Sequence, residues 1–115
     1  MQRKVNLKES VDSLTELYTY LKVGQINDHM LNVLQGKDRT LDFHIHTDSD
    51  EMFYVIEGEM QIEFENSVTD LSEGDFIIVP KGIKHRPIVN SLVKVLLIEK
   101  NGTLTKDNTG GTFSG

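Results

Sequence analysis

The sequence predicts an all-β domain with a short helix near its N-terminus. Between residues 25 and 99, runs in which apolar and polar side chains alternate are separated by short polar clusters of glycine, asparagine, aspartate or serine. Before residue 25, apolar side chains recur at three- and four-residue intervals, which is the spacing of a helix. The 115 residues fit one domain, residues 1–115, which is long enough to bury a core without cross-links.

The N-terminal segment, residues 1–24, carries the helical spacing. Its apolar positions are Leu7, Val11, Leu14, Leu17, Tyr18 and Leu21. Ser10 is placed to cap the start of this helix. We expect the helix to cover one open end or one face of a barrel. We prefer this role to one in which Tyr18 or Tyr20 closes over a ligand.

Residues 25–99 are expected to supply the strands of the barrel. The first strand is expected at residues 25–35, and later ones at 41–46, 51–56, 60–65, 76–79 and 92–99. The strand at residues 51–56 is apolar on both faces, so both faces must be buried. One face fills the core, and the other needs the helix or a second subunit. We therefore expect a homodimer.

The last segment, residues 100–115, is expected to form an extended tail. It is rich in glycine, threonine and asparagine, and its only large apolar residues are Leu104 and Phe113. A segment of this composition is ordered when another surface holds it. We expect it to lie along its own barrel, along a partner subunit or against a neighbouring molecule.

The composition argues against several classes of function. Because the chain has no cysteine, it has no disulfide, no thiolate ligand and no thiol nucleophile. The formal net charge of -6 comes without a cluster of lysine and arginine, so we expect neither a nucleic-acid nor a membrane partner. The N-terminus has no apolar stretch and later apolar runs are short, so we expect a cytoplasmic protein.

Residues 41–58 contain the first group of candidate ligands. Along a strand, His44 and His46 share one face with Asp42. The four residues between His46 and Glu51 favour a turn, so a hairpin can return Glu51 beside the two imidazoles. Imidazole nitrogens and a carboxylate oxygen suit zinc, iron, nickel or manganese. This group therefore predicts part of a metal site.

A later stretch supplies one more candidate ligand. Pro80 and Gly82 favour a tight turn, which places His85 near the start of the next extended segment. The remaining histidine, His29, lies in the first expected strand. A lone histidine in a strand is more often a surface or structural residue, so we leave His29 out of the site.

Together these two stretches resemble the two sequence motifs of the cupin superfamily. The first runs His44, one residue, His46, four residues, Glu51, six residues, Gly58; the second runs Gly74, five residues, Pro80, one residue, Gly82, two residues, His85. The resemblance spans Gly36 to Asn90. Relative to the family pattern, Gly36 lies two positions early and Asn90 lies one position late. It implies a small double-stranded β-helix (jelly-roll) barrel. It also implies one divalent metal ion, held by three histidines and one glutamate: His44, His46, Glu51 and His85.

The donor set indicates what this site can do. Four protein ligands leave one or two positions open on a five- or six-coordinate ion. Three neutral imidazoles and one carboxylate leave a net positive charge, so the open positions favour an anionic or chelating oxygen ligand. We therefore predict a metal-binding cupin that acts by Lewis-acid chemistry on a small oxygen-rich molecule.

The sequence leaves two kinds of function open. If the protein is an enzyme, the resemblance implies a metal-dependent isomerase, dioxygenase or lyase. Similar short cupins are likened to mannose-6-phosphate isomerases, and other members of the superfamily are dioxygenases, lyases or epimerases. A phosphosugar would need basic residues, and those near His85 are Lys81, Lys84 and Arg86. The alternative is a non-catalytic module that binds or senses a small ligand, because no acid or base beyond the ligands is evident.

Overall fold

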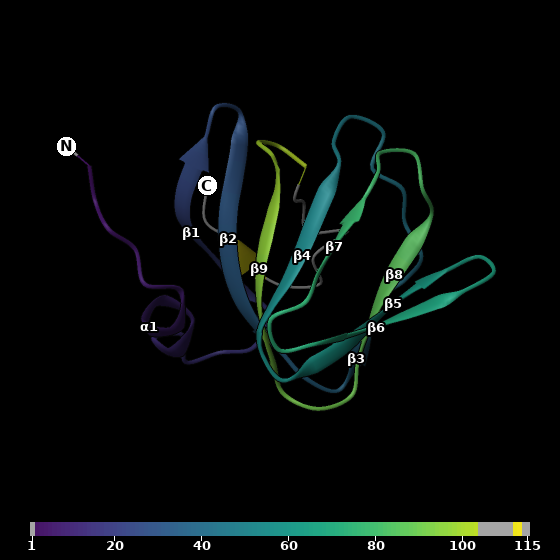
Figure 1. Cartoon of the computed structure of the whole chain (residues 1–115), viewed down its shortest axis with the longest axis horizontal. Helices are drawn as coiled ribbons and strands as arrows, with labels where there is room; N and C mark the ends of the chain where they lie inside the picture. Colours follow the sequence, from purple (N-terminus) through teal and green to yellow (C-terminus); the bar gives the residue numbers. More distant parts are fainter. Residues whose placement is uncertain (1, 104–111, 114–115) are drawn as a thin grey trace.

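Two sheets pack face to face and form the jelly-roll barrel that the sequence predicts, as Figure 1 shows. This computed structural model describes residues 2–103 and 112–113. Within these residues the larger sheet contains, in spatial order, β10 (Thr112–Phe113), β1 (Thr19–Ile26), β2 (His29–Gly36), β9 (Val93–Lys100), β4 (Glu51–Glu57) and β7 (Phe76–Val79). The smaller sheet contains β3 (Arg39–Thr40), β8 (His85–Val89), β5 (Glu59–Phe64) and β6 (Val68–Ser72).

The hydrophobic core lies between the two sheets, because side chains alternate between the faces of each strand. The larger sheet contributes mainly Phe53, Val55, Val93, Val95 and Leu97, and the smaller sheet contributes Met60, Ile62, Leu71 and Val89. The outer face of the larger sheet has a second apolar cluster around Val11, Val33 and Leu96. Strand β4 is therefore buried on its inner face and half-buried on its outer face.

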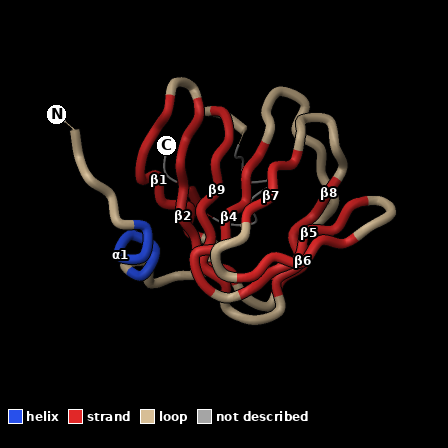
Figure 2. Tube along the Cα trace, viewed as in Figure 1, coloured by secondary structure: helices blue, strands red, loops and turns tan. Residues whose placement is uncertain are grey.

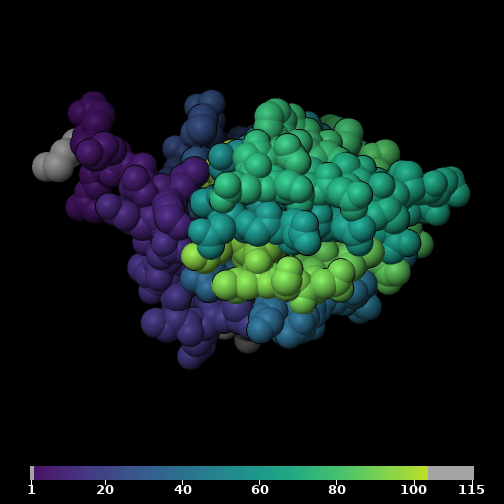
Figure 3. Space-filling model, turned by 60° about the horizontal axis from the view of Figure 1, so that its bottom comes forward, coloured from purple at the N-terminus to yellow at the C-terminus, as the bar shows by residue number. Residues whose placement is uncertain are grey.

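Helix α1 (Leu7–Asp12) is shorter than the apolar periodicity predicts, and Ser10 does not cap it. Its N-cap is Asn6, whose side-chain Oδ1 accepts a hydrogen bond of 2.9 Å from the backbone N–H of Glu9. In Figure 2 this helix lies outside the larger sheet, and in Figure 3 the N-terminal residues gather at one end of the molecule.

The strands begin earlier than the predicted boundary at residue 25, because β1 starts at Thr19. The helical spacing was misleading here. Leu14 and Leu21 do pack in the outer apolar cluster, but from irregular chain and from a strand rather than from a helix. Pairing of β1 with β2 satisfies the backbone of this segment, so tertiary contacts override the local helical pattern.

The prediction of a single strand at residues 25–35 is wrong, because a turn divides this segment between two strands. Strand β1 ends at Ile26 and β2 begins at His29, and these two residues are paired across the hairpin. Asn27 and Asp28 form the connecting turn, with Asn27 at a φ of 52°. Asparagine and aspartate are favoured in two-residue hairpin turns because they tolerate positive φ.

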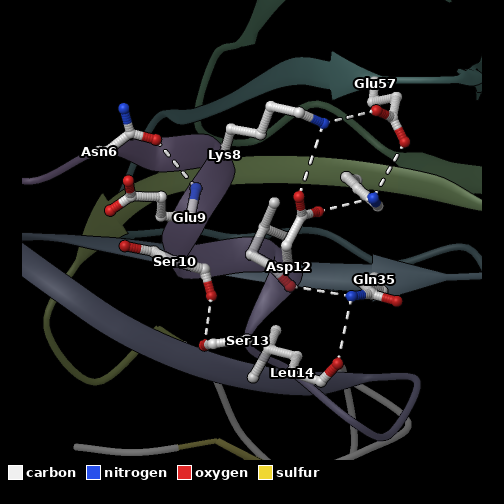
Figure 4. Close-up of polar contacts among 11 residues, drawn as sticks. Asn6, Lys8, Glu9, Ser10, Asp12, Ser13, Leu14, Gln35 and Glu57 are labelled. Carbon is white, nitrogen blue, oxygen red and sulfur yellow. Dashed lines mark hydrogen bonds and ion pairs between the residues drawn. The ribbon is translucent and has the colours of Figure 1, made fainter.

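Polar contacts hold α1 against the outer face of the larger sheet (Figure 4). Lys94 on β9 lies 2.6 Å from an oxygen of Asp12 in the helix and 2.9 Å from an oxygen of Glu57 at the end of β4. The side-chain amide of Gln35 on β2 donates a 2.8 Å hydrogen bond to the carbonyl of Val11. The helix therefore covers part of a sheet face, as predicted.

Removing the helix cap should weaken this attachment. Replacing Asn6 with alanine deletes the acceptor for the Glu9 N–H, which should lower the free energy of unfolding by about 1 kcal/mol. Asn6→Asp keeps an acceptor and should retain nearly wild-type stability. Urea unfolding of the three proteins tests this, and equal midpoints for Asn6→Ala and wild type would contradict it.

Part of the C-terminal tail lies along its own barrel. Thr112 and Phe113 pair in parallel with Thr19 and Tyr20 of β1. The rest of the predicted tail beyond Thr103 lies outside the described residues. Across the described residues, no helix has the length and apolar character needed to span a membrane.

Candidate metal centre

Backbone pairing brings the four predicted ligands together from three parts of the chain. Glu51 is the first residue of β4 in the larger sheet, and His85 is the first residue of β8 in the smaller one. His44 and His85 form an isolated bridge, with N–H to carbonyl distances of 2.9 and 3.1 Å. The carbonyl of His46 accepts a 2.7 Å hydrogen bond from the N–H of Gly82. The site therefore joins the two sheets.

The segment around His44 and His46 is not the regular strand that the sequence predicted. Its only strand-like pairing is the bridge from His44 to His85, so Glu51 does not return in a simple hairpin with the histidines. Instead, Glu51 pairs with Val79 on β7, within the other sheet. The predicted grouping of side chains is correct, although the backbone path that achieves it differs.

One donor atom from each of these four residues lies within 4.8 Å of the others. Glu51 Oε1 is 2.9 Å from His85 Nε2 and 3.5 Å from His46 Nε2. Two ligands at right angles on one ion at about 2.1 Å would be about 3.0 Å apart, and opposed ligands about 4.2 Å apart. The cluster is thus close to the size that a single divalent ion requires.

Hydrogen bonds fix the orientation of two of the imidazoles. His44 Nδ1 lies 2.9 Å from the carbonyl oxygen of Asp42, and His85 Nδ1 lies 2.8 Å from that of Ile83. A carbonyl oxygen can only accept, so each Nδ1 carries a proton and donates it. The Nε2 of each neutral ring is then an unprotonated donor atom. A ring whose other nitrogen donates to a carbonyl oxygen is typical of metal-binding histidines.

The electrostatics around Glu51 also favour a cation at this point. The side chain of Glu51 is only 4% exposed, and that of His85 is 2% exposed. Burial works against ionisation, but hydrogen bonds with His46 and His85 hold the pKa of the Glu51 carboxyl well below its usual range. Burial likewise opposes charge on His85, but Glu51 and the Ile83 carbonyl outweigh it and raise the pKa of His85. Burial lowers the pKa of His44.

His29 lies outside this cluster, as the sequence analysis expected. It is partly exposed at the start of β2, where its Nδ1 lies 2.9 Å from Oδ1 of the neighbouring Asp28. Asp50 is also outside the cluster, and its Oδ1 accepts a 2.9 Å hydrogen bond from the N–H of Lys81.

Sequence reasoning missed two polar residues that face the barrel interior, Asn32 on β2 and Glu99 on β9. Both are fully buried. Burial raises the pKa of Glu99 to about 10, and repulsion from Glu51 adds to the effect. A signal was available, because Asn32 is in phase with Leu34, and Glu99 is in phase with Leu97, on the faces that enter the core.

A pocket of about 240 Å³ adjoins the cluster at His46. It is lined by Ile45, His46, Thr47, Asp48, Lys100, Asn101, Gly102 and Thr103. His46 itself is 9% exposed through its side chain, so a small molecule in this pocket could approach the donor cluster from outside.

The barrel and the donor cluster together define the class of the protein, a cupin. A model of the Cupin domain family matches residues 30–99 of the chain. The chain therefore belongs to this family, and both motif stretches lie within the matched region. The uncharacterized protein YdbB of Bacillus subtilis (strain 168) is 36% identical over 89 residues, which cover 75% of this chain and 76% of that protein.

Solved structures support the same fold. A cupin-2 domain containing protein from Shewanella frigidimarina NCIMB 400 superimposes with a TM-score of 0.80 and 26% identity, covering 84% of this chain and 94% of that one. Protein NMB1881 from Neisseria meningitidis superimposes with a TM-score of 0.76 and 23% identity, covering 86% of this chain and 100% of that one.

A more distant similarity connects the chain with an enzyme. The 3-hydroxyanthranilate 3,4-dioxygenase of Bacillus thuringiensis (strain Al Hakam) is 33% identical over 70 residues. These residues are 56% of this chain but only 38% of that protein, so most of the dioxygenase has no counterpart in the alignment.

Proposed function

We propose that the protein binds one divalent metal ion through His44, His46, Glu51 and His85. The observation that supports this most directly is the 2.9 Å approach of His85 Nε2 to Glu51 Oε1. With Nδ1 of His85 donating to a carbonyl, a neutral ring presents only a lone pair to the carboxylate. Two acceptors this close need a proton or a cation between them, and the neighbouring imidazoles of His44 and His46 complete a donor set for a cation.

We further propose that the bound ion acts on a small oxygen-rich molecule. A zinc, iron, nickel or manganese ion would supply a Lewis acid with open positions for an anionic or chelating ligand. The protein's own part is to hold three imidazoles and a carboxylate in a mostly buried cluster and to admit the ligand through the pocket at His46. The dioxygenase similarity favours an oxygen-rich ring or acid over other substrates.

The structure offers little support for a phosphosugar substrate. Arg86 alternates with His85 on β8, so its side chain lies on the opposite face from the cluster. There its Nε donates a 2.7 Å hydrogen bond to Glu63, and its guanidinium stacks over the ring of Phe43. A phosphate beside the metal would therefore lack this cation, so an isomerase of the mannose-6-phosphate type is not our preferred function.

Turnover assays with metal-loaded protein test the catalytic part of the proposal. Suitable panels are catechols and hydroxy-aromatic acids with oxygen, keto acids, and phosphosugars. Product formation that is lost in Glu51→Ala would support an enzyme. Ligand-induced increases in melting temperature without any turnover would support the alternative, a module that binds or senses a small ligand.

Metal binding should weaken in acid, because the ion and a proton compete for His85. Despite burial, Glu51 raises the pKa of His85 in the metal-free protein, so a proton must leave Nε2 before the ion can bind there. The apparent affinity should be constant above that raised pKa and fall by about tenfold per pH unit below it. Glu51, whose pKa is lowered, stays ionised throughout this range.

His85 should also make the stability of the metal-free protein decrease as pH rises, whereas metal affinity increases with pH. A raised folded-state pKa contributes stability that is present below the unfolded pKa and is lost as pH rises through the folded value. The increase in melting temperature caused by zinc should therefore grow as pH rises toward the raised pKa of His85 and level off above it. A zinc effect that is independent of pH would contradict this prediction.

We also propose that the chain forms a homodimer. Phe76 and Ile78 on the edge strand β7 are 59% and 54% exposed, beside the outer face of β4. Exposed apolar side chains on an edge strand favour association with a second surface. Sedimentation of wild-type protein at micromolar concentration should show a dimer, and Ile78→Lys should shift it toward monomer. A wild-type monomer under these conditions would remove the proposal.

A further inference from the structure

Two buried polar side chains in the barrel lack a full set of hydrogen-bond partners among the described residues. Asn32 and Glu99 are both 0% exposed. Neither the amide nitrogen nor the amide oxygen of Asn32 has a hydrogen-bond partner in that part of the chain. The Glu99 carboxyl has none there besides the Glu51 carboxylate, to which a protonated Glu99 can donate. Buried polar groups in folded proteins are nearly always paired, because an unpaired group costs stability. The Asn32 amide and the remaining oxygen of Glu99, on adjacent strands, therefore indicate that something else pairs with them.

These two side chains lie on the inner face, next to the proposed metal centre. Asn32 is paired in register with Leu97, which belongs to the core between the sheets, and Glu99 lies two residues beyond Leu97 on the same face of β9. On the other side of β9, Met52 is paired with Ile98, which places the preceding Glu51 beside Glu99. A polar row thus runs across β4, β9 and β2, from Glu51 through Glu99 to Asn32.

We propose that Asn32 and Glu99 form a subsite that binds a hydroxyl group of a ligand whose other end chelates the metal ion. This inference rests on the proposed function. It identifies the ligand as a small hydroxy acid with an additional hydroxyl group, rather than as a simple acid or diketone.

The chemistry of the two side chains selects a hydroxyl group. Asn32 offers N–H donors and a carbonyl acceptor, and the Glu99 carboxyl offers an oxygen that accepts and, when protonated, an O–H that donates. A hydroxyl group both donates and accepts, so it can pair with both side chains at once. A second carboxylate or phosphate is disfavoured there, because it would lie next to the carboxyl groups of Glu51 and Glu99. The anionic end of the ligand is therefore directed to the ion, and the neutral hydroxylated end to the subsite.

Matched pairs of hydroxy acids test the inference. Lactate and glycerate differ only in the hydroxyl group at carbon 3, and 2-hydroxybutyrate and 2,4-dihydroxybutyrate differ only in that at carbon 4. Titration calorimetry with zinc-loaded protein should show that the hydroxylated member of at least one pair binds about tenfold more tightly or better. Equal affinities within both pairs, or no binding of any of the four acids, would overturn the inference. Ordered water on Asn32 and Glu99 would give that result.

Two variants remove the subsite independently. Asn32→Val and Glu99→Met delete the polar atoms without adding bulk, so either one serves if the other does not fold. Each should reduce the preference for the hydroxylated acid to about twofold or less while zinc content stays at one ion per chain. Met30→Leu changes an interior neighbour without removing a hydrogen-bonding group, and it should retain the preference. A preference that survives in both subsite variants would overturn the inference.

Measuring the zinc content distinguishes a failure of the proposed metal site from a failure of the proposed subsite. If wild-type protein binds no metal even after reconstitution, the proposed function is wrong, and the inference falls with it. If wild-type protein binds zinc but does not distinguish the acids within either pair, only the subsite is wrong.

Discussion

Replacing His85 with alanine is expected to weaken zinc binding by at least about 100-fold, because a direct ligand matters at least as much as the residues that orient it. His85 is nearly buried, its Nδ1 is held by Ile83, and its Nε2 faces Glu51 at 2.9 Å. Alanine removes a donor that no neighbouring side chain can replace, and it leaves Glu51 buried with one partner fewer. Competition against a chromophoric chelator measures the affinity, and elemental analysis measures the metal content.

The remaining ligands and one unrelated histidine provide the comparison. His46→Ala and Glu51→Ala should show losses of metal similar to that of His85→Ala, because each residue contributes one donor to the same cluster. His29→Ala should bind zinc as wild type does, since His29 pairs with Asp28 at the surface. Wild-type metal content in all three ligand variants, or none in wild-type protein, would refute the metal centre.

Replacing Gly58 with alanine is expected to lower the free energy of unfolding by about 3 kcal/mol or more. Gly58 joins β4 to β5 at a φ of 89°, a conformation that side chains disfavour. An added Cβ would lie 2.5 Å from the backbone oxygen of Leu92, so the two chain segments would have to move apart. Those segments carry the core residues Val55 and Val93, and their separation would disturb the packing there.

Gly74 provides a matched control for this substitution. It has nearly the same φ, 88°, but an added Cβ would meet nothing within 4 Å. Gly74→Ala should therefore carry only the backbone strain, about 1–2 kcal/mol. Urea unfolding of the two variants separates strain from steric overlap. Equal losses of stability in Gly58→Ala and Gly74→Ala would show that the contact with Leu92 does not matter.

The candidate ligands could be identified from sequence because the motif spacing points to them even where the local secondary structure is predicted wrongly. A hairpin was expected to return Glu51 beside His44 and His46, yet the structure groups these side chains with His85 through backbone pairing in both sheets. The motif spacing reflects the final grouping of the side chains. It therefore predicted the cluster even where the expected strand at residues 41–46 was absent.

Other features depended on contacts that local patterns do not contain. The apolar spacing of Leu14 and Leu21 suits a helix, but the outer face of the sheet buries these side chains without one. Asn32 and Glu99 have residue types that are usually exposed, so they were not assigned to the interior. Only the registers of β2, β9 and β4 place Glu99 beside Glu51, and Asn32 beyond Glu99.

The location of the candidate ligands in both sheets bears on the order in which the protein folds and acquires a metal ion. Glu51 and His85 lie 34 residues apart in the chain and in different sheets, so they meet only when strands distant in the chain have paired and the two sheets have packed. Such non-local pairing is a slow step in folding. Before it is complete, no preorganised donor set exists, so an ion cannot direct folding as it does in a zinc finger. An ion bound at the proposed site would therefore enter a finished barrel, and its identity would reflect which metal the surroundings supply at that time.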